Sequence, residues 1–264
     1  MINKNIATGA LLTPSGPQQL GLGVALGLTD IGTVRTSNQD NFLVDAGLGL
    51  VAVADGMGGH ADGERASAEA LAVLADALRA AVAPATPARQ VGVLRDAVGY
   101  ANQHLYQANL ADGRGDGSGM GTTLTGLWQA TPGGPLCIFH VGDTRLYRYR
   151  AGQLVQLTHD QTLHQQALDA GYEHNLPPRN LLLQALGPAA EVTPELLVES
   201  AMPNDLYLLC SDGLHGACGD EPIAAVLGEV ARAGLAACCA QLIDMAKHAG
   251  SRDNITALLL HCTP

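Results

Sequence analysis

Segments of helical spacing alternate along the chain with short runs of apolar residues. In the first such segment Leu71, Leu74 and Leu78 recur on one face, which is the period of an amphipathic helix. The prolines that follow it, before a second segment of the same spacing, favour a helical hairpin. Helices are predicted over 63–83, 88–109, 221–232 and 234–248, and a short helix with a polar loop over 160–179.

The remaining apolar runs are short and rich in β-branched residues and leucine, as in strands. Two of them are separated by Ala151-Gly152, a pair that suits a hairpin turn. Runs of strands that frame two helical pairs favour an α+β domain with largely antiparallel sheets. Strands are predicted at 22–29, 42–45, 49–54, 122–129, 136–142, 144–150, 153–157, 181–185, 192–199, 205–210 and 254–262.

Composition limits the class of protein. Of 264 residues 47% are hydrophobic and 15% charged, which suits one domain with a sizeable core and argues against disorder. The net charge of −11 disfavours nucleic acid and anionic membrane surfaces as partners. No apolar stretch approaches the ~18 residues of a membrane span. Six cysteines without a C-x-x-C pair are expected to be free thiols, so a cytoplasmic protein is predicted.

Acidic residues stand where predicted strands end. One such aspartate is ordinarily a turn residue or a helix cap, but five are hard to dismiss. Carboxylates gathered at one place need cations to stay ionised together, and oxygen ligands favour Mg²⁺ or Mn²⁺. Two such ions can activate a shared water for attack on phosphorus. Arg35, just before the first aspartate, suits binding of phosphate oxygens. The five are Asp40, Asp55, Asp143, Asp212 and Asp253.

Six sequence blocks around these residues resemble, in order, the motifs of the metal-dependent protein phosphatase family (PPM, type 2C), in the form typical of bacterial stand-alone members. The resemblance covers roughly residues 22–262 and leaves 1–21 as an N-terminal extension before a phosphatase domain at 22–264. The blocks are R-T-S-N-Q-D-N (35–41), V-A-D-G-M-G-G-H (53–60), G-M-G-T-T (119–123), H-V-G-D-T-R-L-Y (140–147), L-L-C-S-D-G-L (208–214) and S-R-D-N-I-T (251–256).

The resemblance implies a four-layer αββα sandwich, with two antiparallel sheets flanked by helical pairs, and two or three Mn²⁺ or Mg²⁺ ions at one end. It implies that Asp55 bridges two metals, that the Gly56 carbonyl binds the second, and that Asp212 and Asp253 complete the first. Asp40 would hold metal-bound water, and Asp143 with Asp212 would form a third site. Arg35 would hold the substrate phosphate, while Thr122 and Asn254 support the loops.

Departures from the family pattern also matter. Gln39 replaces a common Glu, which is expected to weaken the second metal modestly. Met57 stands where some eukaryotic members carry a histidine proposed as general acid, so a metal-bound water or another group must protonate the leaving oxygen; His60 is a less favoured candidate. The loop T-H-D-Q-T (158–162) matches only loosely, and 163–190 resembles the mobile flap that helps recognise the substrate.

The implied function is a serine/threonine protein phosphatase in signalling, which hydrolyses phosphoserine and phosphothreonine with water activated between two divalent cations. The expected partners are phosphorylated proteins, the substrates of a Ser/Thr kinase or the kinase itself, and the protein is expected to be a monomer. A binding module of the same fold is the alternative, but such proteins typically lose a metal aspartate. A phosphatase for a small metabolite also stays open.

Overall fold

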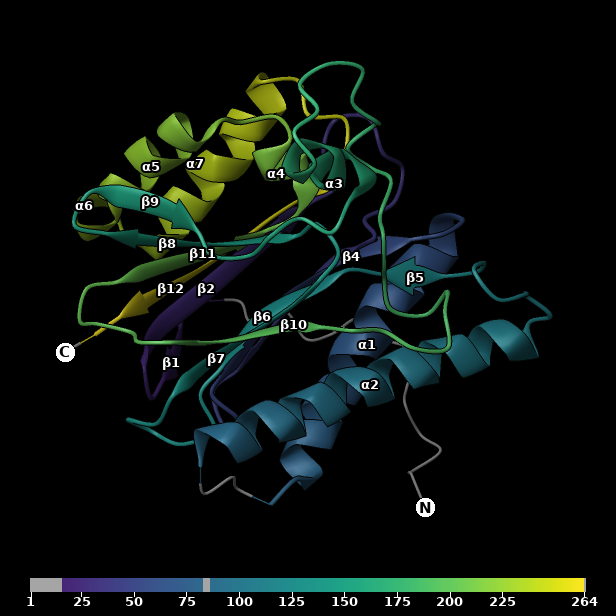
Figure 1. The fold of residues 1–264 in the computed structure, drawn as a ribbon. Helices are drawn as coiled ribbons and strands as arrows, with labels where there is room; N and C mark the ends of the chain where they lie inside the picture. The colour runs from purple at the N-terminus through teal and green to yellow at the C-terminus, as the bar shows by residue number, and fades with distance from the viewer. Residues whose placement is uncertain (1–15, 83–85, 264) are drawn as a thin grey trace.

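Two six-stranded antiparallel sheets, stacked face to face, form the centre of the molecule (Figure 1). The structure, a computed structural model, describes residues 16–82 and 86–263. The first sheet has the order β1-β2-β12-β11-β8-β9: β1 Gln18–Leu20, β2 Gly23–Asp30, β12 Ile255–Cys262, β11 Leu206–Cys210, β8 Arg145–Arg150 and β9 Gln153–Gln156. The second has the order β10-β7-β6-β4-β3, with β5 beside β4: β10 Glu195–Glu199, β7 Leu136–Val141, β6 Leu124–Trp128, β4 Leu50–Met57, β3 Asp40–Asp45 and β5 Gly121–Thr122.

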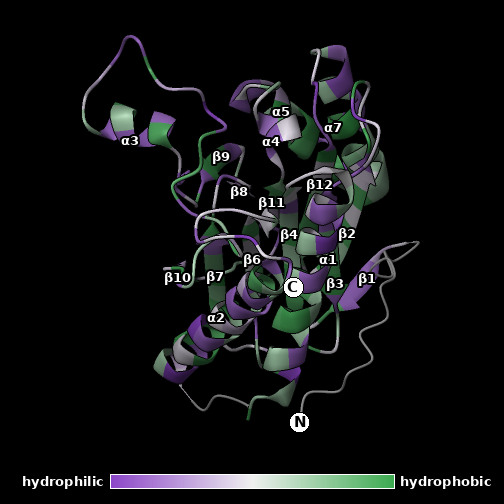
Figure 2. Ribbon diagram, turned by 90° about the vertical axis from the view of Figure 1, so that its right-hand side faces the viewer, coloured by the Kyte–Doolittle hydropathy of each residue, from purple (hydrophilic) through white to green (hydrophobic). Residues whose placement is uncertain are grey.

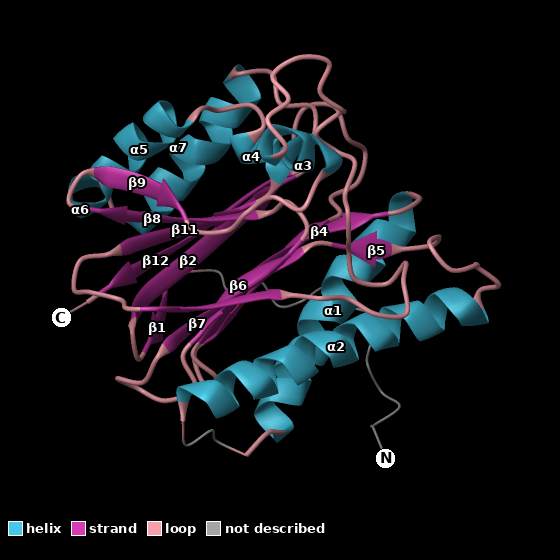
Figure 3. Cartoon of the chain, in the orientation of Figure 1, coloured by secondary structure: helices cyan, strands magenta, loops and turns pink. Residues whose placement is uncertain are grey.

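Helices cover the outer face of each sheet. The long pair α1 and α2 lies against the second sheet, and α5 and α7 lie against the first, which makes four layers (Figure 3). The expected αββα sandwich is therefore confirmed. No helix among the described residues has the length and apolar character needed to cross a membrane. The helices are α1 His60–Ala80, α2 Pro87–Ala111, α3 Leu163–Asp169, α4 Asp212–His215, α5 Asp220–Gly228, α6 Val230–Ala233 and α7 Leu235–His248.

The central strands of the sheets are buried on both faces. In β4, Val51 and Val53 point into the layer between the sheets, whereas Leu50 and Ala52 point toward α1 and α2. Successive side chains of a strand alternate between faces, so a strand in the middle of a sandwich reads as a continuous apolar run. The helices are apolar on one side only (Figure 2). This difference explains why the hydrophobic pattern separated strands from helices along the sequence.

Local sequence sets the start of α2 and the β8–β9 hairpin. The Thr86 side chain accepts a hydrogen bond from the Arg89 backbone N–H, and Pro87 follows at a position that has no intrahelical N–H partner to lose. In the hairpin, Ala151 and Gly152 both have positive φ, 49° and 82°. Those angles fit a two-residue turn between twisted antiparallel strands, as predicted.

Four details of the predicted element pattern are wrong. The strand predicted at 181–185 is irregular chain with isolated bridges at Leu182 and Leu186. The helix predicted at 221–232 is split after Gly228 into α5 and α6, because glycine disfavours a helix interior. The short helix α4 was not predicted. The strand β1, which pairs with β2 at the edge of the sheet, was not predicted either. It lies within the predicted N-terminal extension 1–21, of which residues 1–15 lie outside the described residues.

The layer between the sheets provides the first prediction. Leu209 of β11 is fully buried there, whereas Leu197 of β10 is 37% exposed. Leu209→Ala should lower the free energy of unfolding by about 2–5 kcal/mol, because it leaves a cavity between rigid sheets. Leu197→Ala is the matched control and should cost less than half as much. Urea denaturation followed by circular dichroism measures both, and equal losses would contradict this packing.

Candidate active site

The five predicted aspartates gather at one end of the sandwich. Asp40 begins β3 and is the register partner of Asp55 near the end of β4. Asp143 follows β7, Asp212 begins α4 directly after β11, and Asp253 precedes β12. Their charges interact: Asp55 is subject to the repulsion of the four others. The tertiary structure thus brings together carboxylates that lie far apart in the sequence.

These carboxyl groups resist ionisation. Burial, reinforced by repulsion from neighbouring carboxylates, raises the pKa of Asp212 to about 6 and that of Asp143 to about 8, against 3.8 for an ordinary aspartate. Burial also raises the pKa of Asp40 to about 7, although two hydroxyl hydrogen bonds oppose it, and raises that of Asp55 well above its usual value. A divalent cation would remove the repulsion, so the cluster is a place where cation binding is favourable.

Hydroxyl groups from two other strands hold Asp40. Ser211 Oγ and Thr256 Oγ1 each donate to Asp40 Oδ2, at 2.6 and 2.7 Å. The Thr256 backbone N–H in turn donates to Ser211 Oγ at 3.0 Å. Because these three residues come from β3, β12 and the end of β11, the contact ties the two sheets together at the site. Asp40 is only 3% exposed, and the two hydroxyls orient its carboxylate.

The backbone of Asp55 is held equally firmly. Its N–H donates to Thr123 Oγ1 at 2.9 Å, and its carbonyl oxygen accepts from Thr122 Oγ1 and from the Thr123 N–H, also at 2.9 Å. A side chain on the next residue, Gly56, would lie 2.0 Å from the Gly63 carbonyl oxygen, so only glycine fits. The carboxylate of Asp55 stays partly accessible, as a ligand-binding group must.

Arg35 lies against the same cluster. Its Nη2 is 2.6 Å from Asp253 Oδ2, and both side chains are substantially exposed. Asn254 fixes the loop that carries Arg35: its amide donates to the carbonyls of Ile31 and Ser37, and its Oδ1 accepts from the Gln39 N–H. The guanidinium is therefore at the rim of the carboxylate cluster, where it can reach an anion that approaches from solvent.

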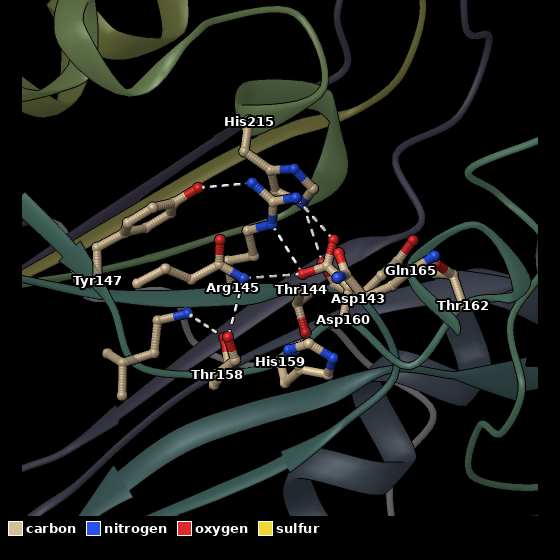
Figure 4. Close-up of polar contacts among 12 residues, drawn as sticks. Asp143, Thr144, Arg145, Tyr147, Thr158, His159, Asp160, Thr162, Gln165 and His215 are labelled. Carbon is tan, nitrogen blue, oxygen red and sulfur yellow. Dashed lines mark hydrogen bonds and ion pairs between the residues drawn. The ribbon is translucent and has the colours of Figure 1, made fainter. Parts of the chain in front are cut away.

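Asp143 is fixed through its neighbours (Figure 4). Arg145 donates to both oxygens of Asp160, at 2.8 and 2.7 Å, and to the Tyr147 hydroxyl. Both partners of this ion pair are largely buried, and Arg145 holds the pKa of Asp160 below its usual value despite the burial. His215 Nε2 donates to the Asp143 carbonyl at 3.0 Å. Asp143 thus lies beside α4, which contacts its carbonyl, and just before β8, which is tied by Arg145 to the segment that leads into the predicted flap.

The fit of this site to metal ions rests on its donors. In the described part of the chain no group of three or more His, Cys, Asp or Glu side chains is arranged as a ready-made metal site. However, Asp212 Oδ1 is buried without a hydrogen-bond partner, an expensive arrangement that a cation would relieve. Mg²⁺ usually keeps several waters and takes only one or two carboxylates from the protein. Oxygen donors, repulsion and an orphaned oxygen therefore fit a hydrated hard cation.

Several residues of the site were not predicted. Ser211 and Thr256 hold the carboxylate of Asp40, Thr123 holds the backbone of Asp55, and all three stand inside the sequence blocks within two positions of a predicted residue. Asp160 stands in the block that matched only loosely, so nothing pointed to its pairing with Arg145. The signal that could have found Ser211, Thr123 and Thr256 is their position inside the motif blocks, close to the residues that were predicted. The side chain of His60, the less favoured candidate for the general acid, lies outside what the structure describes.

Comparison with known proteins agrees with this geometry. The family model described as protein phosphatase 2C matches residues 33–234. The chain is 38% identical over 238 residues to the serine/threonine protein phosphatase PstP of Mycobacterium tuberculosis, with 88% of this chain and 43% of the relative covered. It therefore spans less than half of that relative. It is also 34% identical over 240 residues to the serine/threonine phosphatase stp of Listeria welshimeri, with 88% and 93% covered.

Among solved structures, the catalytic domain of PstP in complex with two manganese ions superimposes with a TM-score of 0.77 and 33% identity, over 91% of this chain and 98% of that one. The family model spans most of the chain, and the fold, the order of the motifs and the carboxylate cluster agree with it. The chain belongs to the protein phosphatase 2C family.

Proposed function

We propose that this chain is a serine/threonine protein phosphatase that depends on Mn²⁺ or Mg²⁺ and hydrolyses phosphoserine and phosphothreonine. The observation that carries the proposal is the convergence of five aspartates, four of them with raised pKa values, beside the guanidinium of Arg35. Two bound cations would lower the pKa of a shared water and offset the charge of the phosphate. The relatives that the chain resembles are serine/threonine phosphatases by name.

Each carboxylate has a proposed role. Asp55 would bridge two cations, with the Gly56 carbonyl at the second and Asp212 and Asp253 at the first. Asp40, held rigid by two hydroxyls, would accept hydrogen bonds from water at the cations. Asp143 with Asp212 would form a third cation site. The family resemblance implies these roles, and the oxygen donors and the position of the residues at one end of the sandwich support them.

Other side chains of the site would bind the phosphate and hold the loops in place. Arg35 would bind two phosphate oxygens through its planar guanidinium, because a fork of N–H donors matches that geometry. Asp253, its present partner, would then exchange the arginine for a cation. Thr122 and Asn254 would keep the Asp55 strand and the Arg35 loop in register. Such pre-positioning counts because phosphate-monoester hydrolysis is very slow without a catalyst.

We further propose that the substrates are phosphorylated proteins, the targets of a Ser/Thr kinase or the kinase itself, and that segment 163–190 acts as a substrate-contacting flap in a domain that extends to residue 264. A monomeric cytoplasmic protein with a signalling role completes the proposal. In support, all six cysteines are buried free thiols, as is usual in a reducing compartment.

Removing the central carboxylate tests the metal-dependent mechanism. Asp55→Asn should lower kcat for p-nitrophenyl phosphate on the order of a thousandfold in Mn²⁺, because a cation-binding charge is worth several kcal/mol in the transition state. EDTA should abolish wild-type activity, and excess Mn²⁺ should restore it. Asp96→Asn, on the exposed face of α2, is the matched control and should keep full activity.

Two outcomes would contradict the proposal. Undiminished hydrolysis in metal-stripped wild-type protein would exclude the cation mechanism. Binding of Mn²⁺ by calorimetry without turnover of any phosphopeptide would instead favour a binding module of the same fold. Faster hydrolysis of sugar phosphates than of phosphopeptides would redirect the proposal toward a small metabolite.

Stability of the metal-free protein should depend on pH. The raised pKa values of Asp40 and Asp143, about 7 and 8, mean that the folded state keeps protons that the unfolded chain has lost. Stability must then fall as the pH rises from about 6.5 to 8.5. In this window the buried His140 and His215, whose burial lowers their pKa values to about 4 and 3, are neutral in the folded protein and add little.

Thermal denaturation in EDTA at both ends of this window measures the effect. Tm should be lower at the alkaline end, and Mn²⁺ at 100 times its dissociation constant should raise it by roughly 5–10 °C there. Asp143→Asn should reduce the pH dependence, since it removes one of the titrating carboxyls. A Tm that rises with pH in EDTA would show that the carboxylates do not repel one another in the folded state.

A further inference from the structure

A pocket beside Arg35 extends beyond the carboxylate cluster. Its volume is about 640 Å³. Arg35, Asp212 and Asp253 line it, and most of the remaining lining comes from the end of α4 and from the loop between α7 and β12, which lie next to each other at this end of the molecule. The volume is that of a site for a whole ligand, within the ~300–1,000 Å³ typical of binding pockets. A phosphate group held by Arg35 would leave much of this space for its neighbours.

The small residues in the lining of this pocket suit a peptide. Gly216, Ala217, Ala249 and Gly250 line it and carry no side chain beyond Cβ, so an extended backbone can approach closely. Val34, which is 51% exposed, adds an apolar contact at the edge. These small residues, together with Ser251 and Arg252, form a surface that we call the shelf. Residues that flank a phosphorylated side chain can lie on it.

The shelf is held in place. The Ser251 N–H donates to the Ala246 carbonyl at 3.0 Å, and the Thr33 hydroxyl donates to the Ser251 carbonyl at 3.3 Å. Two residues further on, Asp253 pairs with Arg35. The loop between α7 and β12 is thus tied to the loop that carries Arg35, so these two parts of the pocket lining are held together.

Arg252 is the cationic group of this shelf. It lines the pocket, is exposed, and makes no ion pair with any residue in the described part of the chain. Most other cationic side chains that the structure describes, including Arg35, Arg145 and Lys247, do have a carboxylate partner. In a chain of net charge −11, an arginine left unpaired next to Asp253 keeps its donors for an external anion.

We propose that this pocket is a subsite for the residues that flank the phosphorylated side chain, and that Arg252 selects an anionic group there. The inference rests on the proposed function. It narrows the expected substrates to phosphopeptides that carry a second negative charge near the phosphorylated residue. That charge is a carboxylate of Asp or Glu or a second phosphate, since a guanidinium binds both.

Matched phosphopeptides test the subsite. A set of phosphothreonine peptides is made from one parent sequence. In each peptide one of the two residues before or the two residues after the phosphothreonine is Ala, Glu, phosphoserine or Lys. The wild-type protein in Mn²⁺ should favour an anionic neighbour over Ala roughly threefold to tenfold in kcat/KM, mainly through KM, at one position at least. The Glu and phosphoserine peptides show which anion is preferred.

Variants at Arg252 assign the preference. Arg252→Ala should abolish it, Arg252→Lys should keep most of it, and Arg252→Glu should reverse it in favour of the Lys peptide. The preference is a ratio of two peptides, so a general loss of activity cancels. Arg95→Ala, which removes an exposed arginine of α2 on the opposite side of the sandwich, is the matched control and should leave the ratio unchanged.

Three results would overturn the subsite alone: no anionic preference in the wild-type protein, a preference that survives in Arg252→Ala, or an equal loss in Arg95→Ala. In each, p-nitrophenyl phosphate is still hydrolysed by the wild-type protein. If the wild-type protein fails to hydrolyse p-nitrophenyl phosphate in Mn²⁺, the proposed function is overturned, and the subsite with it. The small substrate therefore separates the two failures.

Discussion

The mutual repulsion of buried carboxylates is the constraint on which this molecule depends. Asp55 is subject to the charges of four other aspartates in an environment that already penalises ionisation. Folding alone could not favour such a cluster, because each group would be more stable in water. The arrangement makes sense as a site that is completed by divalent cations, and the family to which the chain belongs is consistent with that.

The sandwich positions two of these aspartates with hydrogen bonds. The hydroxyls of Ser211 and Thr256 hold Asp40, and threonines of β5 and the β5–β6 junction hold the backbone of Asp55. The strands that supply these groups come from both sheets. Packing between the sheets and geometry at the site are therefore coupled, so a cavity between the sheets should also disturb the carboxylates.

A second polar network lies behind the cluster. The buried pair of Arg145 and Asp160 joins β8 to the segment that leads into residues 163–190, and His215 contacts the carbonyl of Asp143 from α4. Loss of either ion-pair partner would leave an uncompensated buried charge, which typically costs about 3–5 kcal/mol. The same end of the molecule carries the hydrogen-bonded loop of Arg252, so the groups that we propose to contact a substrate stand on fixed supports.

The sequence by itself determined the element types, the layered class and the identity of the acidic residues, because side-chain periodicity and strand-end aspartates are local signals. It could not show the edge strand β1 or the helix α4, which are too short to have a period, or the irregular course of 181–185. Only the tertiary structure decided that Ser211 supports Asp40, that Arg145 pairs with Asp160, and that Arg252 borders a pocket. Those contacts join residues far apart in the chain, and nothing in the local pattern of either partner reveals the other.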